Sequence, residues 1–251
     1  MKKVNLSRLM KKGKTLILAY DQGLEHGPID FNDKNVDPKY IIDIAKKGGY
    51  QAIVFQKGIA EKYQEEIKRS KVPLILKLNG KTKIYKGEPF SPLICTVKEA
   101  IKLGANAVGY TIYIGSEYET KMFEEFEKVE KDAHAKGLPV VAWIYPRGKS
   151  VKKDTSREMI AYSTRVGLEL GADIVKVKYG GNINDLKWAV KAAGRTRVVI
   201  AGGTKKSEKE FLKQVKDIVG SGALGLAVGR NIWQSKNPLE LTKKIQKIVF
   251  K

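Results

Sequence analysis

The chain has 251 residues, of which 42% are hydrophobic, and no apolar run approaches the roughly 18 residues that span a bilayer, so we expect a large core and no membrane partner. The net charge of +21 comes from lysines mixed with glutamates along the whole chain, without a zinc-finger spacing or an RNA-binding motif, which favours a solvated surface over a nucleic-acid partner. The single cysteine, Cys95, excludes a disulfide within the chain, and the basic N-terminus lacks the apolar core of a signal peptide, which predicts a cytoplasmic protein.

Short apolar segments alternate with segments of helical periodicity along the whole chain. They are rich in Val, Ile, Leu and aromatic residues, as expected of strands that are buried on both faces. The predicted strands are residues 15–21, 52–57, 74–80, 107–113, 139–145, 174–179, 197–203 and 225–230. Eight strand–helix units with short connections and no linker predict an α/β fold, a single (β/α)8 TIM barrel over residues 1–251. An open, doubly wound sheet is the alternative.

The predicted helices carry recognisable start and stop signals. Several pairs fit the capping box, in which a Ser or Thr and a Glu three residues later satisfy free N–H groups: Thr96 with Glu99, Ser116 with Glu119, Thr155 with Glu158, and Ser207 with Glu210. Asp37 before Pro38 fits an N-cap followed by proline at the first helical position. Glycines shortly before the next strand, such as Gly104 and Gly171, mark the helix ends.

Reactive side chains are expected at the carboxyl ends of the strands, where such barrels place their active sites. Alternation along the sixth strand turns Lys176 and Lys178 toward the barrel interior, and both burial and a neighbouring ammonium favour a neutral amine, which can attack a carbonyl. Lys176 lies deeper and is the predicted nucleophile, Tyr145 is a candidate for proton transfer, and Asp21 is a candidate for holding substrate and lysine in place. Trp143 shares a face with Tyr145. Ion pairing inside the barrel is the alternative interpretation of the lysines.

Glycines follow the seventh and eighth strands and predict a phosphate site. Gly202 and Gly203 come after the seventh strand, and Gly229 and Arg230 after the eighth. Exposed glycine N–H groups can approach an anion closely, and loops at these two positions often hold phosphate in (β/α)8 barrels. Tight turns are the alternative. His26, in the loop after the first strand, is either a substrate contact or a structural residue.

The remaining candidate ligands have simpler interpretations. His134 lies in a polar helix and is expected to be exposed, and Cys95 is expected to pack in the core. Asp21, Glu25 and His26 form the one set that could hold a divalent ion, but no metal-ligand spacing is present, so we expect neither a metal nor a cofactor.

The chain resembles the archaeal-type class I fructose-bisphosphate aldolases, which are Schiff-base TIM-barrel aldolases. The resemblance spans nearly the whole chain and rests on the segments around Asp21–Pro28, Trp143–Gly148, Asp173–Tyr179, Gly202–Gly203 and Gly225–Asn231. It implies that Lys176 forms the Schiff base, Tyr145 transfers protons and Asp21 is the carboxylate of the site. It further implies these substrate contacts: Trp143, His26 and Arg147 beside the sugar, and Gly202, Gly203, Gly229 and Arg230 on the phosphate.

The implied reaction is the reversible cleavage of fructose 1,6-bisphosphate to dihydroxyacetone phosphate and glyceraldehyde 3-phosphate in glycolysis and gluconeogenesis. The resemblance also implies a homo-oligomer, often a decamer, and no metal or cofactor. One alternative is a 2-amino-3,7-dideoxy-D-threo-hept-6-ulosonate synthase or a related transaldolase-like enzyme with the same lysine. A non-enzymatic nucleic-acid binder is the other. Lys77, Lys178 and residues 80–92 are candidates for holding the distal phosphate.

Overall fold

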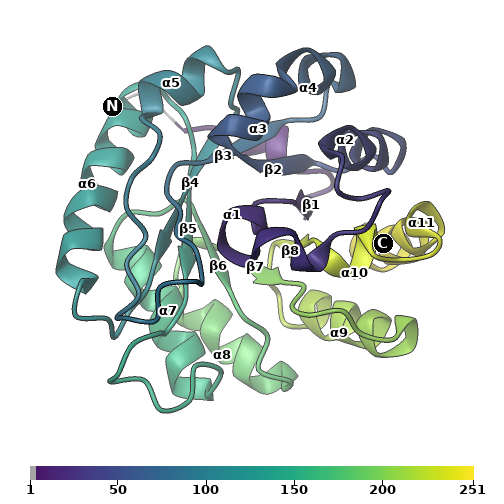
Figure 1. Ribbon diagram of the computed structural model, residues 1–251. Helices are drawn as coiled ribbons and strands as arrows, with labels where there is room; N and C mark the ends of the chain where they lie inside the picture. The colour runs from purple at the N-terminus through teal and green to yellow at the C-terminus, as the bar shows by residue number, and fades with distance from the viewer. Residues whose placement is uncertain (1–3) are drawn as a thin grey trace.

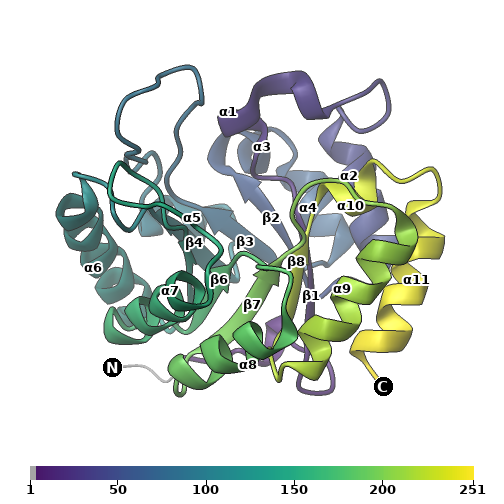
Figure 2. The same ribbon diagram turned by 90° about the horizontal axis from the view of Figure 1, so that it is seen from below.

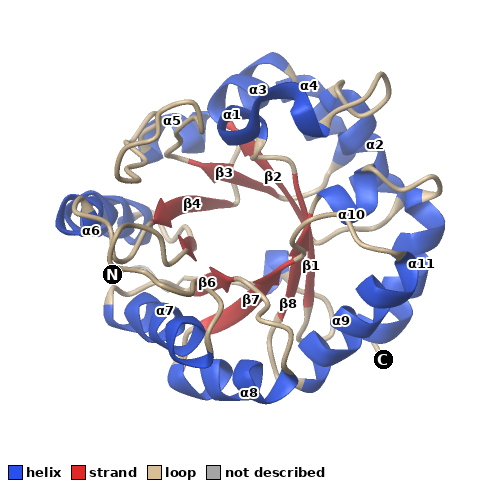
Figure 3. Ribbon diagram, turned by 60° about the horizontal axis from the view of Figure 1, so that its bottom comes forward, coloured by secondary structure: helices blue, strands red, loops and turns tan. Residues whose placement is uncertain are grey.

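The protein is a closed barrel of parallel strands surrounded by helices (Figures 1 and 3). The structure, a computed structural model, describes residues 4–251. The strands run in sequence order around the barrel, and β1 pairs with β8 to close it, so the predicted (β/α)8 fold is confirmed and the open sheet is excluded. The strands are β1 Thr15–Ala19, β2 Ala52–Gln56, β3 Leu74–Lys77, β4 Ala107–Ile112, β5 Val140–Ile144, β6 Ile174–Val177, β7 Arg197–Ala201 and β8 Gly225–Val228.

The longer helices form the outer ring, as Figure 3 shows in the view along the barrel, whereas Leu9 of the short helix η1 packs in the layer inside the barrel. The helices are η1 Ser7–Leu9, α1 Gly23–His26, η2 Gly27–Asp30, α2 Pro38–Lys47, α3 Lys57–Lys62, α4 Gln64–Ser70, α5 Val97–Lys102, α6 Glu119–Ala135, α7 Arg157–Glu169, α8 Ile183–Ala192, α9 Glu208–Gly220, α10 Arg230–Trp233 and α11 Pro238–Val249. None of the helices in residues 4–251 is both long and apolar enough to span a membrane.

Alternation along the strands divides the core into two apolar layers. Leu16, Leu18 and Val175 belong to the layer between the strands and the helices, whereas Ile17 and Ile174 belong to the layer inside the barrel. Each layer therefore takes every second residue of a strand, which is why the strands read as nearly continuous apolar runs. Because of this alternation, a strand can carry one polar side chain into the barrel while its neighbours in the chain stay buried in the outer layer.

The helix starts agree with the predictions in part. Thr96 and Ser207 each form the complete capping box, and Asp37 accepts a hydrogen bond from the Lys39 N–H as an N-cap. Two predictions are wrong. Ser156 rather than Thr155 caps α7, and α6 begins after Tyr118 rather than after Ser116. The Ser116 hydroxyl instead donates to the Pro89 carbonyl at 2.7 Å, so this serine ties two loops together.

The connections at the carboxyl ends of the strands build one face of the molecule. Figure 2 shows α1 and the connection from β3 to α5 projecting at this face, with the C-terminus at the opposite end of the barrel. The predicted strands were too long at this end, because several continued one to three residues beyond the last paired residue. Some of those extra residues, among them Asp21, Tyr145 and Gly203, line the mouth of the barrel, whereas others, such as Tyr20 and Leu78, pack in the outer layer of the core.

Candidate active site

A pocket of about 480 Å³ opens at the carboxyl ends of the strands. Every strand except β2 and β4 contributes to its lining, directly or through the loop that follows it. The lining residues are Ala19, Asp21, Gln22, Glu25, His26, Lys77, Lys83, Tyr145, Arg147, Thr155, Lys176, Lys178, Tyr179, Ala201, Gly202, Gly203, Thr204, Lys206, Gln214, Ala227, Gly229 and Arg230. All of the predicted site residues except Trp143 thus meet at one pocket.

Lys176 lies at the floor of this pocket. It sits on β6 between Val175 and Val177, which are buried toward the helices, so strand alternation turns its side chain inward. Only 6% of the residue is exposed. Burial lowers the pKa of Lys176 to about 8, with Lys77 adding to the effect and Asp21 opposing it. A substantial fraction of this amine is therefore neutral near physiological pH.

Asp21 and Lys77 form a buried ion pair beside the nucleophile candidate. Lys77 Nζ lies 3.1 Å from Asp21 Oδ2, and both side chains are under 10% exposed. Burial by itself would raise the pKa of Asp21, but the charges of Lys77 and Lys176 outweigh it and lower the pKa below its ordinary value. Asp21 is thus an ionised carboxylate. The sequence predicted its contact with Lys176 but missed its direct partner Lys77, which comes from a different strand.

Trp143 lies beneath the pocket rather than in its lining. It is 1% exposed, and the nitrogens of Lys176 and Lys77 lie 5.4 Å and 5.9 Å from the centre of its ring. The ring fits against Gly109 on the neighbouring strand, where an added Cβ would stand 1.7 Å from an indole carbon. Trp143 therefore shapes the floor under the lysines. The sequence predicts that Trp143 contacts the substrate, but its buried position under the lysines does not favour a direct contact.

Tyr145 lies just beyond β5, above Trp143 on the same face of the strand, and lines the pocket. Burial, followed by the charge of Asp21, raises the pKa of Tyr145 well above its ordinary value. The side chain is therefore a neutral phenol at physiological pH. Within residues 4–251 its hydroxyl has no side-chain hydrogen-bond partner, and the residue lines the pocket, so the hydroxyl is available to a bound ligand.

The surroundings of Lys178 differ from those that the sequence predicts. It lies beyond the end of β6, forms an ion pair with Asp154, and its side chain is 30% exposed. The second ammonium that lowers the pKa of Lys176 is that of Lys77, not of Lys178 as predicted. The error has a simple physical cause: β6 ends at Val177, so the alternation of the strand no longer determines where Lys178 points.

Free backbone donors collect at the end of β7 and β8. The N–H groups of Gly203, Thr204, Gly229 and Arg230 donate to no acceptor within the described residues, and all of these residues line the pocket. Gly203 has a φ of 76°, a left-handed conformation that suits glycine. Free N–H groups beside a guanidinium can bind a phosphate.

Gly202 has a different place in this loop. Its N–H donates to the Ala227 carbonyl at 3.0 Å, and its own carbonyl accepts from Asn231 at 3.0 Å. A Cβ at this position would stand 3.0 Å from Val228 Cγ2, so the residue allows close packing of the two strand ends. Gly202 thus shapes the loop and has no free N–H for an anion. Asn231, which the sequence analysis missed as a loop organiser, also accepts from the Lys206 N–H.

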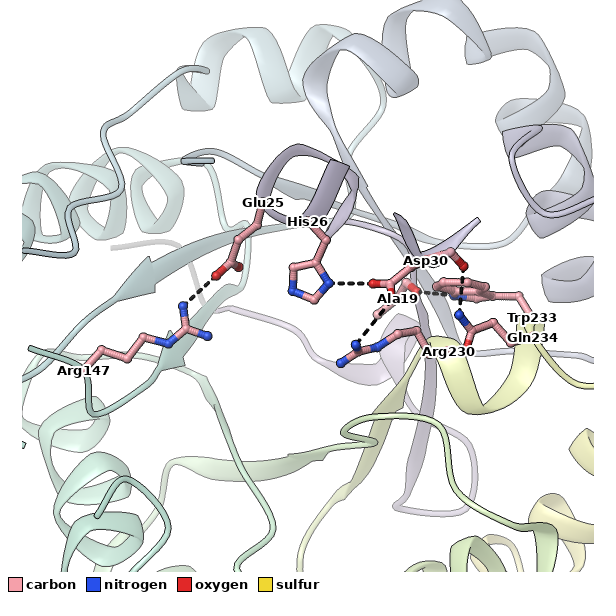
Figure 4. Close-up of polar contacts among 8 residues, drawn as sticks. All are labelled: Ala19, Glu25, His26, Asp30, Arg147, Arg230, Trp233 and Gln234. Atoms are coloured by element: carbon pink, nitrogen blue, oxygen red, sulfur yellow. Dashed lines mark hydrogen bonds and ion pairs between the residues drawn. The ribbon is translucent and has the colours of Figure 1, made fainter. Parts of the chain in front are cut away.

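The rim of the pocket is tied together by ion pairs from α1 and η2, as Figure 4 shows. Glu25 Oε1 lies 2.6 Å from Arg147 Nη1. Asp30 faces two partners, with His26 Nδ1 at 2.5 Å and Arg230 Nη1 at 3.6 Å. The segment between the first two strands therefore carries carboxylates that hold the two predicted arginines in place.

Residues outside the pocket have structural roles. His134 was predicted to be exposed, which is wrong: its side chain is 13% exposed and lies between Glu130 at 2.5 Å and Asp173 at 2.8 Å. Cys95 is buried, and burial raises the pKa of its thiol to about 11, so it is a poor nucleophile. In residues 4–251 no group of three or more metal-ligating side chains is placed to hold a metal ion.

Together these residues place a partly neutral amine, an ionised carboxylate and a neutral phenol around one cavity with an anion-binding end. An amine of this kind can add to a carbonyl, and the phenol can exchange protons with the adduct. The cationic rim suits a phosphorylated ligand.

Comparisons with known proteins agree with this chemistry. The family model described as DeoC/LacD family aldolase matches residues 15–235. The class 1 fructose-bisphosphate aldolase of Thermoproteus tenax is 51% identical over 243 residues, which cover 96% of this chain and 91% of the relative. A protein of Methanocaldococcus jannaschii named fructose-bisphosphate aldolase/6-deoxy-5-ketofructose 1-phosphate synthase is 39% identical over 263 residues, covering 98% of this chain and 84% of the relative.

Among solved structures, one described as an archaeal fructose-1,6-bisphosphate aldolase with the catalytic lysine covalently bound to the carbinolamine intermediate of the substrate has a TM-score of 0.94. Its sequence is 49% identical, and the match covers 98% of both chains. The chain belongs to the DeoC/LacD aldolase family and, within it, to the group of archaeal class 1 fructose-bisphosphate aldolases.

Proposed function

We propose that the protein is a Schiff-base aldolase that reversibly cleaves fructose 1,6-bisphosphate into dihydroxyacetone phosphate and glyceraldehyde 3-phosphate. The observation that carries the proposal is Lys176, a buried lysine with a pKa of about 8 that lies in a pocket of about 480 Å³. The names of the relatives support the same reaction.

The reaction begins when the neutral amine of Lys176 adds to the C2 carbonyl of the ketose. Loss of water from the carbinolamine gives a protonated imine, which accepts the electron pair of the C3–C4 bond as that bond breaks. The net proton movement is from the C4 hydroxyl to C3, and Tyr145 is the side chain that mediates it. Hydrolysis of the imine then releases dihydroxyacetone phosphate and restores the lysine. Asp21, held by Lys77, keeps a negative charge beside the cationic imine.

The C1 phosphate is proposed to lie at the free N–H groups after β7 and β8, next to Arg230. The distal phosphate would then reach the opposite side of the pocket. Lys178 and Lys83 line that pocket and are the proposed contacts. Lys77 is a weaker candidate than the sequence indicated, because Asp21 already neutralises it. His26 and Arg147 are proposed to lie beside the sugar chain.

A transaldolase-like synthase of the same family is the second candidate, because the relative of Methanocaldococcus jannaschii carries a synthase activity, that of a 6-deoxy-5-ketofructose 1-phosphate synthase, beside the aldolase activity in its name. Both candidates share the lysine chemistry and differ in the aldehyde partner. A panel of dihydroxyacetone phosphate acceptors that includes glyceraldehyde 3-phosphate and aspartate semialdehyde separates them, since exclusive use of glyceraldehyde 3-phosphate would eliminate the synthase.

We also propose that the protein works in the cytoplasm as a homo-oligomer, for which a decamer is the expected size. Large apolar side chains are exposed near the mouth of the barrel, among them Leu24, Val36 and Ile94. Apolar side chains that share a surface often mark contacts between proteins. Light scattering coupled to size-exclusion chromatography measures the size, and a monomer at micromolar concentration would contradict this proposal.

The function is tested by comparing two lysine variants of the same strand region. Lys176→Met is expected to abolish cleavage of fructose 1,6-bisphosphate in a coupled assay, whereas Lys178→Met, a matched change in the same pocket, is expected to retain it with a higher KM. Cleavage that persists unchanged in the folded Lys176→Met variant would refute the Schiff-base assignment. A chelator is expected to leave the parent rate unchanged.

A further inference from the structure

Glu25 has a place in the pocket that the reaction above does not explain. It lies on α1, a short helix whose N-cap residue makes no side-chain cap and which has no buried residues of its own. The Glu25 side chain is nevertheless only 16% exposed, because it turns into the mouth of the barrel toward Arg147 (Figure 4). A carboxylate facing a pocket for phosphorylated ligands repels them unless its charge is used for something else.

Glu25 forms an ion pair with Arg147. Its Oε1 accepts a hydrogen bond from Arg147 Nη1 at 2.6 Å, which is short for a charge-assisted bond. Burial would raise the pKa of Glu25, but the Arg147 charge outweighs it and lowers the pKa, so the carboxylate is ionised. The backbone of Arg147 is fixed independently, since its N–H donates to the Ile114 carbonyl at 2.9 Å. Glu25 therefore determines where the guanidinium points, not where the loop lies.

The guanidinium held in this way lies over two aromatic rings. Its central carbon is 5.0 Å from the ring centre of Tyr113 and 5.7 Å from that of Tyr145. A cation within about 6 Å of a ring centre is attracted to the ring face. A second cation, Lys178, lies 5.8 Å from the Tyr145 ring, but its pair with Asp154 is more exposed and holds it less firmly. The Tyr145 hydroxyl has no side-chain hydrogen-bond partner among the described residues, so contacts with the ring are what orient it.

We propose that Glu25 is a positioning residue, which orients the Arg147 guanidinium and, through it, the Tyr145 ring for proton transfer to and from C3 of the imine. The inference rests on the proposed aldolase function. It adds a residue that does not touch the reacting atoms and acts on them through Arg147 and Tyr145. Loss of Glu25 should therefore slow one step of the reaction and leave another unchanged. Imine formation by Lys176 does not need an oriented phenol, whereas proton transfer at C3 does, because misplacement by about 1 Å slows such a step strongly.

The two steps can be measured separately with dihydroxyacetone phosphate alone. Borohydride reduction traps the imine on Lys176. In deuterium oxide, the C3–H bond of the imine breaks and its electron pair forms the enamine. The Tyr145 oxygen accepts that proton while its own phenolic proton passes to a solvent molecule in the pocket, so the residue stays a neutral phenol. Deuterium then returns to C3 from the exchanged residue. The ratio of deuterium uptake to trapped imine therefore reports proton transfer alone, and both quantities are read by mass spectrometry.

Three variants provide the test. In Glu25→Ala, the ratio of uptake to trapping is expected to fall on the order of tenfold, with trapping unchanged. Glu25→Gln keeps an amide oxygen that accepts from Arg147, so its ratio is expected to stay within about threefold of the parent. Asp30→Ala is the matched control, because Asp30 is equally buried on the same segment, with a side chain 15% exposed, but pairs with His26 and Arg230 instead. It is expected to weaken phosphate binding and to keep the parent ratio.

Several results would overturn the inference. They are an unchanged ratio in Glu25→Ala, a parallel loss of trapping and uptake, a Glu25→Gln variant as slow as Glu25→Ala, and an equal fall in Asp30→Ala. If Glu25→Ala fails to fold by its melting temperature, Arg147→Met carries the same test, since it removes the guanidinium and should lower the ratio to the same extent. Absence of trapping in the parent protein would instead refute the aldolase function itself, so the two failures are distinguishable.

Discussion

The charges around Lys176 should control when it reacts. At pH 7, an amine with the Lys176 pKa of about 8 is neutral in about 10% of molecules, against about 0.03% for an ordinary lysine. The pocket thus increases the reactive fraction by roughly 300-fold, which corresponds to about 3 kcal/mol. Lys77 lowers this pKa and Asp21 raises it, so removing either charge should shift it in a known direction.

Lys77→Met removes the ammonium that disfavours a second positive charge and frees Asp21 to attract Lys176 instead. Both changes raise the pKa of Lys176, and an increase of about one unit would lower the neutral fraction at pH 7 about tenfold. Asp21→Asn removes the carboxylate that favours the charged amine, so the pKa should fall below 8.

The assay is the rate of imine formation at low dihydroxyacetone phosphate concentration, followed by borohydride quenching from pH 6 to 10. The parent rate should rise with an apparent pKa near 8. The curve should move to higher pH in Lys77→Met and to lower pH in Asp21→Asn. Curves that move in the same direction, or a parent curve that still rises steeply at pH 10, would refute the electrostatic reasoning.

Further predictions concern stability and binding. Lys176→Met should raise the melting temperature at pH 7, because folding of the parent buries an amine whose pKa falls from 10.5 to about 8. The parent, but not the variant, should gain stability as the pH rises from about 8 to 10.5. Equal melting temperatures at pH 7 would show that burying the charged amine does not destabilise the parent. Lys77→Met should lower the melting temperature, because it leaves a buried carboxylate without its partner; calorimetry of the two variants side by side measures both signs. Arg230→Met should raise the KM for phosphorylated substrate about tenfold with little change in kcat, and steady-state kinetics would contradict this if KM stayed constant. Gly109→Ala should destabilise the fold by about 1–3 kcal/mol in urea unfolding, because the new Cβ would stand 1.7 Å from a carbon of Trp143; an unchanged midpoint would show that the ring can move at no cost.

The fold was predictable because its signal is periodic. Eight apolar segments separated by helical segments specify the barrel, and the alternation rule placed Lys176 inside it between outward valines. The same rule was less informative two residues later at Lys178, where the strand has already ended: this side chain lines the pocket but pairs with Asp154 instead of joining the buried group around Lys176. Alternation holds only while the backbone is paired, and the sequence does not mark the last paired residue sharply.

The charge pairing of the site was not predictable from the sequence. Asp21 meets Lys77, Glu25 meets Arg147, and His134 meets Asp173, in each case across elements that are distant in the chain. These contacts depend on the register and stagger of a closed barrel, which no local pattern encodes. Two local signals, the capping boxes at Thr96 and Ser207, were predicted correctly, with both partners in one helix turn. The equally local patterns at Ser116 and Thr155 gave the wrong cap, because the pattern does not fix the residue at which a helix begins.

The shared role of the glycines after β7 was only partly visible. The pattern pointed to a phosphate loop, but it did not distinguish Gly203, whose N–H is free, from Gly202, whose N–H is already bonded to Ala227. That distinction arises from the pairing of β7 with β8 and becomes apparent only in three dimensions.

The assignment of Lys176 as the Schiff-base residue is tested most directly by borohydride reduction of the protein with dihydroxyacetone phosphate, followed by peptide mapping. The expected result is one reduced adduct per chain on the peptide that contains Lys176, and none in Lys176→Met. An adduct on Lys77 or Lys178, or no adduct in a preparation that cleaves fructose 1,6-bisphosphate, would contradict it.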